Sequence, residues 1–339
     1  MASTRISEQL PHIDTTQSSV GFGNRALPRL YLELQDPQLY IRQRALAVLC
    51  DLVHDPEKAY EAVYNGCLER LKVMLQDSDS SVRIKTTEAV YLIAAHNVGR
   101  DALIKWDVVA PLSDLLDDPV DACRNNVHRA LKRLAEVPAG AEYIVSSGLV
   151  PQLVMKLPVE KDDVLASILA TLCYCVRVDA LPALESHCVL VLRNLLSHPS
   201  PDIRRSVATA LMAISVPLEG KHKVCDGGVL PDLVKLLSGP DLGVTASAAG
   251  TIMYTAIITK GKFQAIEAGA IPPLLKLVQS EDKAVCANAL RALTTLAEVP
   301  CAREQLREQL PLLEGRLNHP ASIIRRAAAT AIRVISWTP

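Results

Sequence analysis

The sequence predicts an all-α fold, a right-handed α-solenoid of about eight stacked helical repeats. A turn-and-helix phrase returns every 39 to 41 residues, and the composition is 49% hydrophobic but only 4% aromatic. Such a chain fills its core with Leu, Ala, Val and Ile, as stacked helices do. Because one short helical repeat cannot bury its own apolar face, neighbouring repeats must stack, and the working part of the molecule is expected to be a surface.

Each repeat is expected to begin with a short first helix and a second helix. One residue, usually glycine, precedes each second helix, and where it is glycine it is expected to take the left-handed backbone conformation without a Cβ penalty. These residues are Gly66, Asp107, Gly148, His187, Gly228, Gly269 and Gln309. A proline then lies in the first turn of the second helix, where its missing N–H is harmless. The prolines are Pro111, Pro151, Pro231, Pro272 and Pro311.

A turn rich in Asp, Ser and Pro leads into the third helix, which carries the longest apolar stripe. In the segment 203–214, apolar residues recur at a spacing of three to four, which predicts one buried helical face. They are Ile203, Val207, Ala210, Leu211 and Ile214. A proline often closes the third helix, as at Pro138, Pro217 and Pro300.

Two parts of the chain depart from this pattern. Residues 149–187 form the least regular unit, with Pro158 in the turn and Pro182 in the usual glycine region, so we expect a local deviation there. Residues 1–24 lack helical periodicity and are rich in Ser and Thr, which predicts a flexible N-terminal tail. The expected division is therefore a tail, 1–24, followed by one solenoid, 25–339.

Composition and motifs exclude several classes of function. The net charge of −1 and the pI of about 6.7 argue against a nucleic-acid or membrane-surface binder. We expect a soluble intracellular protein in a reducing compartment, because no apolar leader or membrane-length run occurs and the nine cysteines include no CxxC pair. Metal, cofactor and nucleophile motifs are also missing. The chain is thus expected to be no enzyme, with no catalytic residues, cofactor, metal or small-molecule substrate.

One phrase resembles a known repeat family. Gly-Ala-Ile-Pro-Pro-Leu at 269–274, followed by a third helix from Ala289, is similar to the armadillo repeat, over about 27–339 of the chain. A HEAT-like feature accompanies it, because an Asp precedes an Arg by six residues at three turns: Asp36/Arg42, Asp77/Arg83 and Asp118/Arg124. We interpret these pairs as a side-chain ladder between turn and helix. The alternative is an exposed basic row.

Segments outside the armadillo consensus carry a second, more specific resemblance. The segments 23–30, 49–57, 82–88, 213–221 and 331–337 resemble the armadillo-repeat radial spoke proteins of motile cilia and flagella. That resemblance implies a structural scaffold of the axonemal radial spoke, in the cytoplasm and cytoskeleton, which supports ciliary and flagellar motility, including that of sperm. Its partners would be other spoke subunits. The alternative is a soluble armadillo adaptor that binds a partner peptide or helix in signalling or transport.

The concave face gives the candidate site. Armadillo proteins that grip extended peptides resemble one another in a repeated Asn on the third helix. The aligned residues here include no Asn: Val48, Leu92, Arg133, Tyr174, Ala213, Tyr254, Thr295 and Val334. An extended peptide would leave its backbone groups poorly paired, so we expect the groove to hold a folded or helical partner.

The expected protein-binding residues on this face combine basic and aromatic side chains, which are enriched at interface hot spots. They are Lys85, Arg129, Arg133, Tyr174, Tyr254 and Arg291. The alternative for each tyrosine is packing between its own repeat and the next. Of the two tryptophans, Trp106 is expected in the core. Trp337 is expected to cover the last repeat, with insertion into a partner as the alternative.

Overall fold

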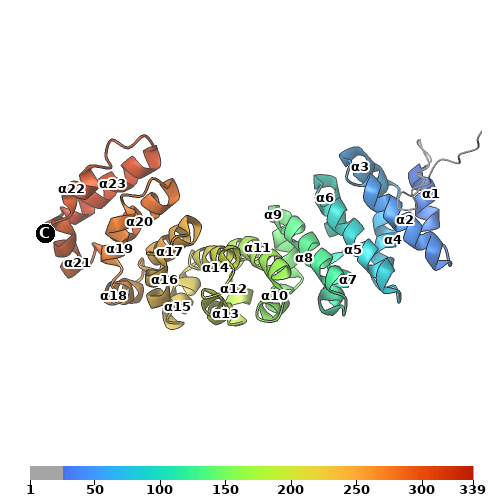
Figure 1. Cartoon of the computed structure of the whole chain (residues 1–339), viewed down its shortest axis with the longest axis horizontal. Coiled ribbons are helices and arrows are strands. Elements are labelled where there is room, and N and C mark those ends of the chain that lie inside the picture. Colours follow the sequence, from blue (N-terminus) through green and yellow to red (C-terminus); the bar gives the residue numbers. More distant parts are fainter. Residues whose placement is uncertain (1–25, 339) are drawn as a thin grey trace, which may run out of the picture. The chain divides into compact units, whose positions relative to one another are not determined.

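A computed structural model describes residues 26–338, and every regular element within this range is a helix (Figure 1). The tail predicted over residues 1–24 lies outside the described residues. The chain divides into two compact units, one ending at Ala130 and one beginning at Leu131. The prediction of a single solenoid over 25–339 stays a prediction, so each unit is described by itself.

The first unit contains a helix pair followed by helix triplets. The pair is α1 (Ala26–Glu33) and α2 (Leu39–Leu52). The next triplet is α3 (Pro56–Tyr64), α4 (Cys67–Met74) and α5 (Ser80–Ala94). Then follow α6 (Asn97–Lys105), α7 (Val109–Ser113) with the 3₁₀ turn η1 (Asp114–Asp117), and α8 (Asp121–Ala135), in which the boundary between units falls.

The second unit continues the same order of first, second and third helix. The triplets are α9 (Pro138–Ser146), α10 (Val150–Lys156), α11 (Asp162–Val178); α12 (Leu181–Glu185), α13 (Cys188–Leu195), α14 (Pro201–Ile214); α15 (Leu218–Asp226), α16 (Leu230–Leu236), α17 (Leu242–Thr255); α18 (Thr259–Glu267), α19 (Ile271–Leu277), α20 (Lys283–Leu296); and α21 (Pro300–Arg307), α22 (Leu310–Glu314), α23 (Ser322–Ile335). Eight third helices therefore occur in residues 26–338, as the period predicts.

The third helices carry the core of the second unit. Helices α11, α14, α17, α20 and α23 pack in chain order, each against the next. On α14 the predicted stripe is confirmed, since Ile203, Val207 and Leu211 are all buried. Burial of this apolar face, at about 25 cal/mol per Å², is the main force that holds the repeats together.

Backbone geometry confirms the predicted break between first and second helices. Six of the seven predicted residues have positive φ, including the non-glycine residues Asp107 at 49° and His187 at 57°. Gln309 differs, with φ of −102°. Several third helices begin at a side-chain cap: Asp79, Asp241 and Asp282 each accept from a backbone N–H group of the first turn.

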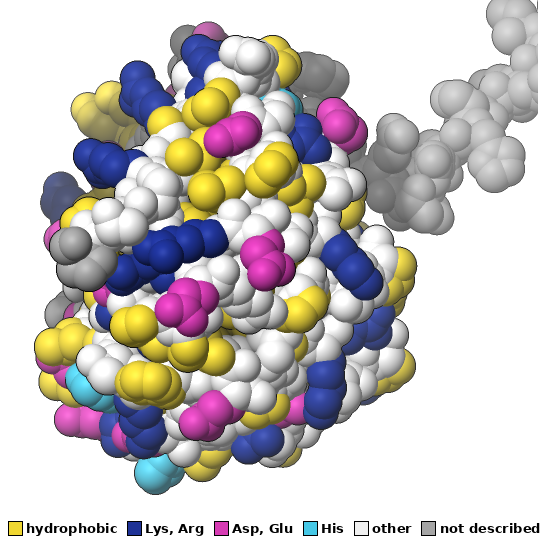
Figure 2. Space-filling view, turned by 90° about the vertical axis from the view of Figure 1, so that its left-hand side faces the viewer, with side chains coloured by type: hydrophobic (Ala, Val, Ile, Leu, Met, Phe, Trp, Pro, Cys, Tyr) yellow, Lys and Arg dark blue, Asp and Glu magenta, His cyan; other side chains and the backbone are white. Residues whose placement is uncertain are grey.

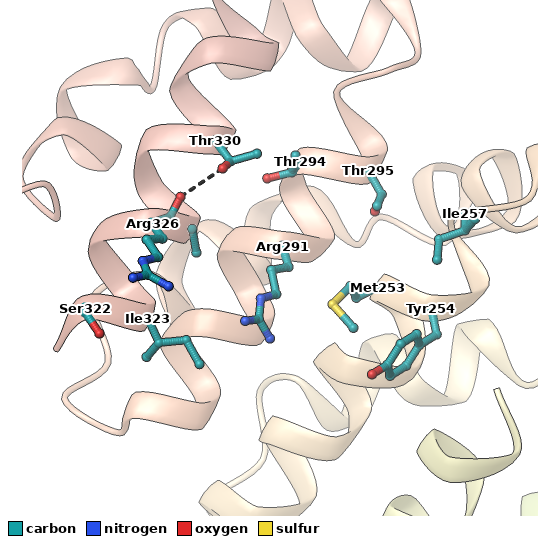
Figure 3. A pocket seen from close by; sticks show the side chains of 11 residues that line it. Met253, Tyr254, Ile257, Arg291, Thr294, Thr295, Ser322, Ile323, Arg326 and Thr330 are labelled. Atoms are coloured by element: carbon teal, nitrogen blue, oxygen red, sulfur yellow. Dashed lines mark hydrogen bonds between the residues drawn. The ribbon is translucent and has the colours of Figure 1, made fainter. Parts of the chain in front are cut away.

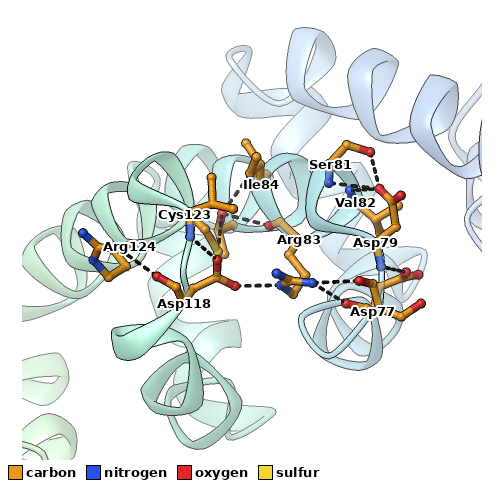
Figure 4. Close-up of polar contacts among 12 residues, drawn as sticks. Asp77, Asp79, Ser81, Val82, Arg83, Ile84, Asp118, Cys123 and Arg124 are labelled. Carbon is orange, nitrogen blue, oxygen red and sulfur yellow. Dashed lines mark hydrogen bonds and ion pairs between the residues drawn. The ribbon is translucent and has the colours of Figure 1, made fainter.

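The predicted Asp/Arg ladder is present, but its bonds differ from a simple pairing within one turn (Figure 4). Arg83 donates from Nη1 to the backbone carbonyls of Asp77 and Ser78, both at 3.0 Å. Its Nε then reaches Asp118 of the next repeat at 2.7 Å. Arg42 likewise donates to its own turn and pairs with Asp77 at 3.2 Å. Each arginine thus closes its own turn and ties that turn to the following repeat.

The irregular unit is confirmed as a local deviation. Third helix α11 is 17 residues long, and the first helix after it, α12, has only five residues and contains Pro182. The prolines predicted to close third helices instead begin the next first helices: Pro138 and Pro300 are the first residues of α9 and α21, and Pro217 is the N-cap of α15. A fixed φ suits that position equally well.

The prediction for Trp106 was wrong. Its side chain is 37% exposed, because it follows the last residue of α6 and lies at the surface beside Lys105. Trp337 is 55% exposed, with one ring face covered by the Arg303 guanidinium at 4.9 Å.

Within residues 26–338, no helix combines the length and apolar character that a bilayer crossing requires.

Candidate protein-binding groove

The predicted basic residues of the first unit already have partners in the chain. Lys85, on α5, pairs with Glu88 at 2.8 Å. Arg129, on α8, lies 3.9 Å over the ring of Tyr91 and donates to its hydroxyl at 2.8 Å. In the second unit, Arg133 pairs with Glu136 at 3.2 Å. Two of the three charges are therefore balanced by a carboxylate, and the Arg129 guanidinium is held against a neutral ring.

The other predicted residues lie on third helices of the second unit. Tyr174 is half-buried on α11, Tyr254 is half-buried on α17, and Arg291 is exposed on α20. Tyr254 and Arg291 line one common groove, whereas Tyr174 does not line it. The site prediction as a whole remains a prediction, and the structure brings two of its six residues together.

This groove crosses three successive third helices, α17, α20 and α23 (Figure 3). We call it the C-terminal groove; its volume is about 760 Å³. Its lining residues are Met253, Tyr254, Ile257, Arg291, Thr294, Thr295, Ser322, Ile323, Arg326, Ala327 and Thr330. In Figure 3 the Arg291 guanidinium lies between Ile323 of α23 and Met253 of α17. The groove is large enough for several side chains of a partner helix.

Small residues let the third helices approach closely beside this groove. At Gly250 of α17, a Cβ would lie 2.5 Å from the sulfur of Met212 on α14 and 3.1 Å from Nδ2 of Asn288 on α20. On α23, the lining residues Ala327 and Thr330 are also small. Short side chains at these positions leave space over the third helices for the groove.

The groove combines apolar surface with unneutralised positive charge. Ile257 and Ile323 are 54% and 44% exposed. Among the residues that the structure describes, the guanidinium groups of Arg291 and Arg326 have no hydrogen-bond or ion-pair partner, and no Asp or Glu lines the groove. A bound carboxylate could therefore meet either arginine without displacing an internal partner.

The groove threonines are satisfied as donors within their own helices. Thr294, Thr295 and Thr330 donate to backbone carbonyls three or four residues earlier, at 2.7, 2.8 and 2.9 Å. Their hydroxyls can still accept a bond, but they do not form a row of free amide-like donor–acceptor pairs. This agrees with the expectation that the groove is poorly suited to the backbone of an extended peptide.

Sequence reasoning missed Arg326, Ile323 and Met253. Arg326 lies about two helical turns before Val334, the residue of α23 that the armadillo alignment places on this face. Extending that alignment by two turns toward the start of each third helix would have found it. Figure 2, viewed from the C-terminal end of Figure 1, shows hydrophobic side chains with both basic and acidic side chains between them.

The structure also bears on metal binding. No group of three or more His, Cys, Asp or Glu side chains within residues 26–338 could hold a metal ion. The eight free cysteines other than Cys301 are buried or half-buried. Burial raises the pKa of the Cys50 thiol to about 12, so this group stays protonated at neutral pH.

Comparisons with known proteins agree with this geometry. The family model of the Armadillo/beta-catenin-like repeat matches residues 259–298, which include α18, α19 and α20. Radial spoke protein 14 of Chlamydomonas reinhardtii is 26% identical over 129 residues, which is 38% of this chain and 33% of that protein. The match therefore spans about a third of the relative's length.

Two solved structures of engineered proteins are similar in fold. One superposes with a TM-score of 0.87 at 24% identity, over 93% of this chain and 79% of the other. A second has a TM-score of 0.63 at 25% identity, over 67% of this chain and 96% of the other. With the all-helical triplets described above, these findings identify the fold as an α-solenoid that contains an armadillo repeat.

Proposed function

We propose that this chain is a non-catalytic scaffold of the axonemal radial spoke, where it binds other spoke proteins through its solenoid surface and supports ciliary and flagellar motility. The observation that carries the proposal is the similarity to a radial spoke protein over 129 residues. Armadillo repeats are binding scaffolds, and a stack of repeats offers an extended surface for protein partners. On this proposal the chain resides in the axoneme, part of the cytoskeleton.

The C-terminal groove is the proposed contact in the second unit. Its apolar residues, Ile257 and Ile323, suit the apolar stripe of a partner helix, and Arg291 and Arg326 suit acidic residues beside that stripe. We therefore propose an amphipathic, acidic helix of a spoke neighbour as the occupant. Charge complementarity would speed its association and fix its orientation.

The competing function is a soluble adaptor that grips an extended peptide. The asparagines nearest in register to the peptide-gripping position do not favour it. Asn126 donates to the carbonyl of Ile84 at 3.2 Å, and Asn288 donates to that of Ala246 at 2.9 Å. Both amides thus join neighbouring third helices, so they support the stack and leave a peptide backbone no regular partner.

Fractionation of motile cilia tests the proposal. A spoke subunit should remain with the axoneme after detergent extraction and be released by strong salt or denaturant. Recovery of the chain entirely in the detergent-soluble fraction would contradict the proposal and favour the adaptor. Crosslinking mass spectrometry on isolated axonemes would then identify the partner and the contacted surface together.

Charge reversal tests the groove itself. Arg291→Glu combined with Arg326→Glu should lower incorporation into axonemes severalfold, because each change places a carboxylate opposite the acidic partner. Lys276→Glu is the matched control, since Lys276 is exposed on α19 and lies outside the groove. Normal incorporation of the double variant would show that the contact lies elsewhere on the surface.

A further inference from the structure

A second groove lies in the first unit, on first and second helices rather than third helices. Three aromatic side chains line it: Tyr60 and Tyr64 of α3, and Trp106 at the end of α6. They are 56%, 80% and 37% exposed. With only twelve aromatic residues in the whole chain, eight Tyr, two Trp and two Phe, three exposed rings in one groove form an unusual cluster. Exposed apolar clusters of this kind mark interaction sites.

The rings are held in place by their own helices. Tyr60 and Tyr64 lie one turn apart, with ring centroids separated by 6.3 Å and planes inclined by 12°. The Trp106 backbone N–H donates to Ala102, and its carbonyl accepts a 2.9 Å bond from Nζ of Lys72 on α4. The groove between these rings has a volume of about 350 Å³, which suits one or two side chains of a partner.

The charge of this aromatic groove is opposite to that of the C-terminal groove. Glu69 and Asp101 line it, and within the described part of the chain neither carboxylate has an ion-pair or side-chain hydrogen-bond partner. The only lining cation is Lys105, whose Nζ lies 5.6 Å from the Trp106 ring centroid. Two carboxylates against one ammonium leave a formal charge of −1, and the Lys105 contact shows that a cation can reach this ring.

We propose that the aromatic groove binds an arginine side chain presented by another protein. A guanidinium is planar, so it can stack on the Tyr60, Tyr64 or Trp106 rings while its N–H groups donate to Glu69 or Asp101. A neutral apolar side chain would leave both carboxylates unpaired, and an acidic one would be repelled. The inference goes beyond the proposed spoke function, because it concerns different helices and a partner of opposite charge.

Tryptophan fluorescence gives a direct test on the purified full-length chain. In a Trp337→Phe background, Trp106 is the one remaining tryptophan. The probe is the peptide acetyl-Gly-Leu-Arg-Leu-Gly-amide, and its neutral match carries citrulline in place of arginine. We expect a saturable change in Trp106 emission with the arginine peptide, a much weaker one with citrulline, and weaker binding at high salt.

Variants then separate the contributions of charge and ring. Glu69→Gln and Asp101→Asn should each weaken arginine-peptide binding, by up to about fivefold, the size expected for one exposed ion pair. Tyr64→Ala should weaken it by a similar factor. Glu142→Gln, an exposed carboxylate in the second unit, is the matched control and should change nothing.

Three results would overturn the proposal: no saturable response up to about 10 mM peptide, equal responses to arginine and citrulline, or unchanged affinity in both carboxylate variants. A stronger response to the same peptide with lysine in place of arginine would overturn the assignment to arginine. The assay uses purified protein and a synthetic peptide, so a negative result would contradict the arginine-binding proposal alone. A negative result in the axoneme experiments would contradict the spoke proposal alone.

Discussion

At the scale of single residues, Arg83 shows how one side chain joins two repeats. Its side chain is 14% exposed, and that of its partner Asp118 is 2% exposed. Burial alone would raise the pKa of Asp118, but the bonds from Arg83 and the Val120 N–H outweigh burial, and the pKa lies below its ordinary value. The ionised pair therefore stabilises the fold.

Removing this arginine should destabilise the first unit clearly. We expect Arg83→Ala to cost about 2–4 kcal/mol of unfolding free energy, because Asp118 would keep a buried charge without its cation. Since the folded pKa of Asp118 is depressed, the pair contributes fully above the ordinary value of 3.8, and its contribution is lost as the pH falls below that value. Urea unfolding at pH 7 and pH 3 measures both effects.

Arg29→Ala is the control for this prediction. Arg29 also pairs with a carboxylate, Glu33 at 2.8 Å, but its side chain is 73% exposed. An exposed pair contributes about 0–1 kcal/mol, so this variant should unfold nearly as the unchanged chain does. Equal losses of unfolding free energy in the two variants would mean that the buried pair stabilises the fold no more than the exposed pair does.

The sequence predicts the ladder only in part. The spacing of six residues between Asp77 and Arg83 is visible in the chain, and it correctly indicates a contact between turn and helix. The bond to Asp118 crosses 35 residues, so it depends on how two repeats stack, and local spacing carries no information about that. The prediction that Trp106 is buried was wrong for a similar reason, because the end of a helix can be exposed although the rest of the helix is buried.

At the scale of helices, four first helices carry a glycine where their backbone lies close to the end of the preceding third helix. Gly99, Gly140, Gly220 and Gly261 are each the third residue of a first helix. A Cβ at any of them would lie 1.7 to 2.1 Å from a backbone carbonyl oxygen near the end of the preceding third helix. At these four turns from third to first helix, the backbones therefore approach too closely for a Cβ.

Gly220→Ala should accordingly destabilise the chain, by about 1–3 kcal/mol. The sign of this stability change is informative, because a Gly→Ala substitution inside a helix normally stabilises a protein by up to about 1 kcal/mol. Here the Cβ would lie 1.7 Å from the Ile214 carbonyl oxygen, so α15 must shift away from α14. Thermal unfolding followed by circular dichroism measures the change.

Gly315→Ala is the matched control in the same unit. Gly315 has a helical φ of −56°, and a Cβ there would meet nothing closer than 3.5 Å. This variant should be neutral or slightly more stable. A gain of stability in Gly220→Ala would show that the close approach is relieved at little cost.

At the scale of the whole molecule, periodicity predicts more than composition does. The 39–41-residue period correctly predicted the helix triplets, their breaks and the eight third helices, because each repeat faces nearly the same neighbours. The period predicted the groove residues less well. Tyr254 and Arg291 were found by register. The partners of Lys85, Arg129 and Arg133 depend on individual residues such as Tyr91, which no repeat pattern specifies.

Cysteine reactivity gives a test that samples the packing throughout residues 26–338. All nine cysteines lie in this range, and only Cys301 is exposed. Burial raises the pKa of the thiols of Cys50, Cys175 and Cys188 to about 12, and of Cys67, Cys123, Cys173 and Cys225 to about 11. At pH 8 a thiol with a pKa of 11 is about 0.1% thiolate, which is the reactive form.

We therefore expect a thiol reagent such as Ellman's reagent to modify one cysteine rapidly in the native chain and all nine in guanidinium chloride. Cys301→Ser should abolish the rapid phase and leave the native fold unchanged, because the side chain of Cys301 is exposed. The slow phases would then report local opening of the repeats, since a buried thiol must be exposed before it reacts. Cys173 is half-buried, so rapid modification of any further cysteine besides Cys301 and Cys173 would show that at least one repeat is packed more loosely than in this structure.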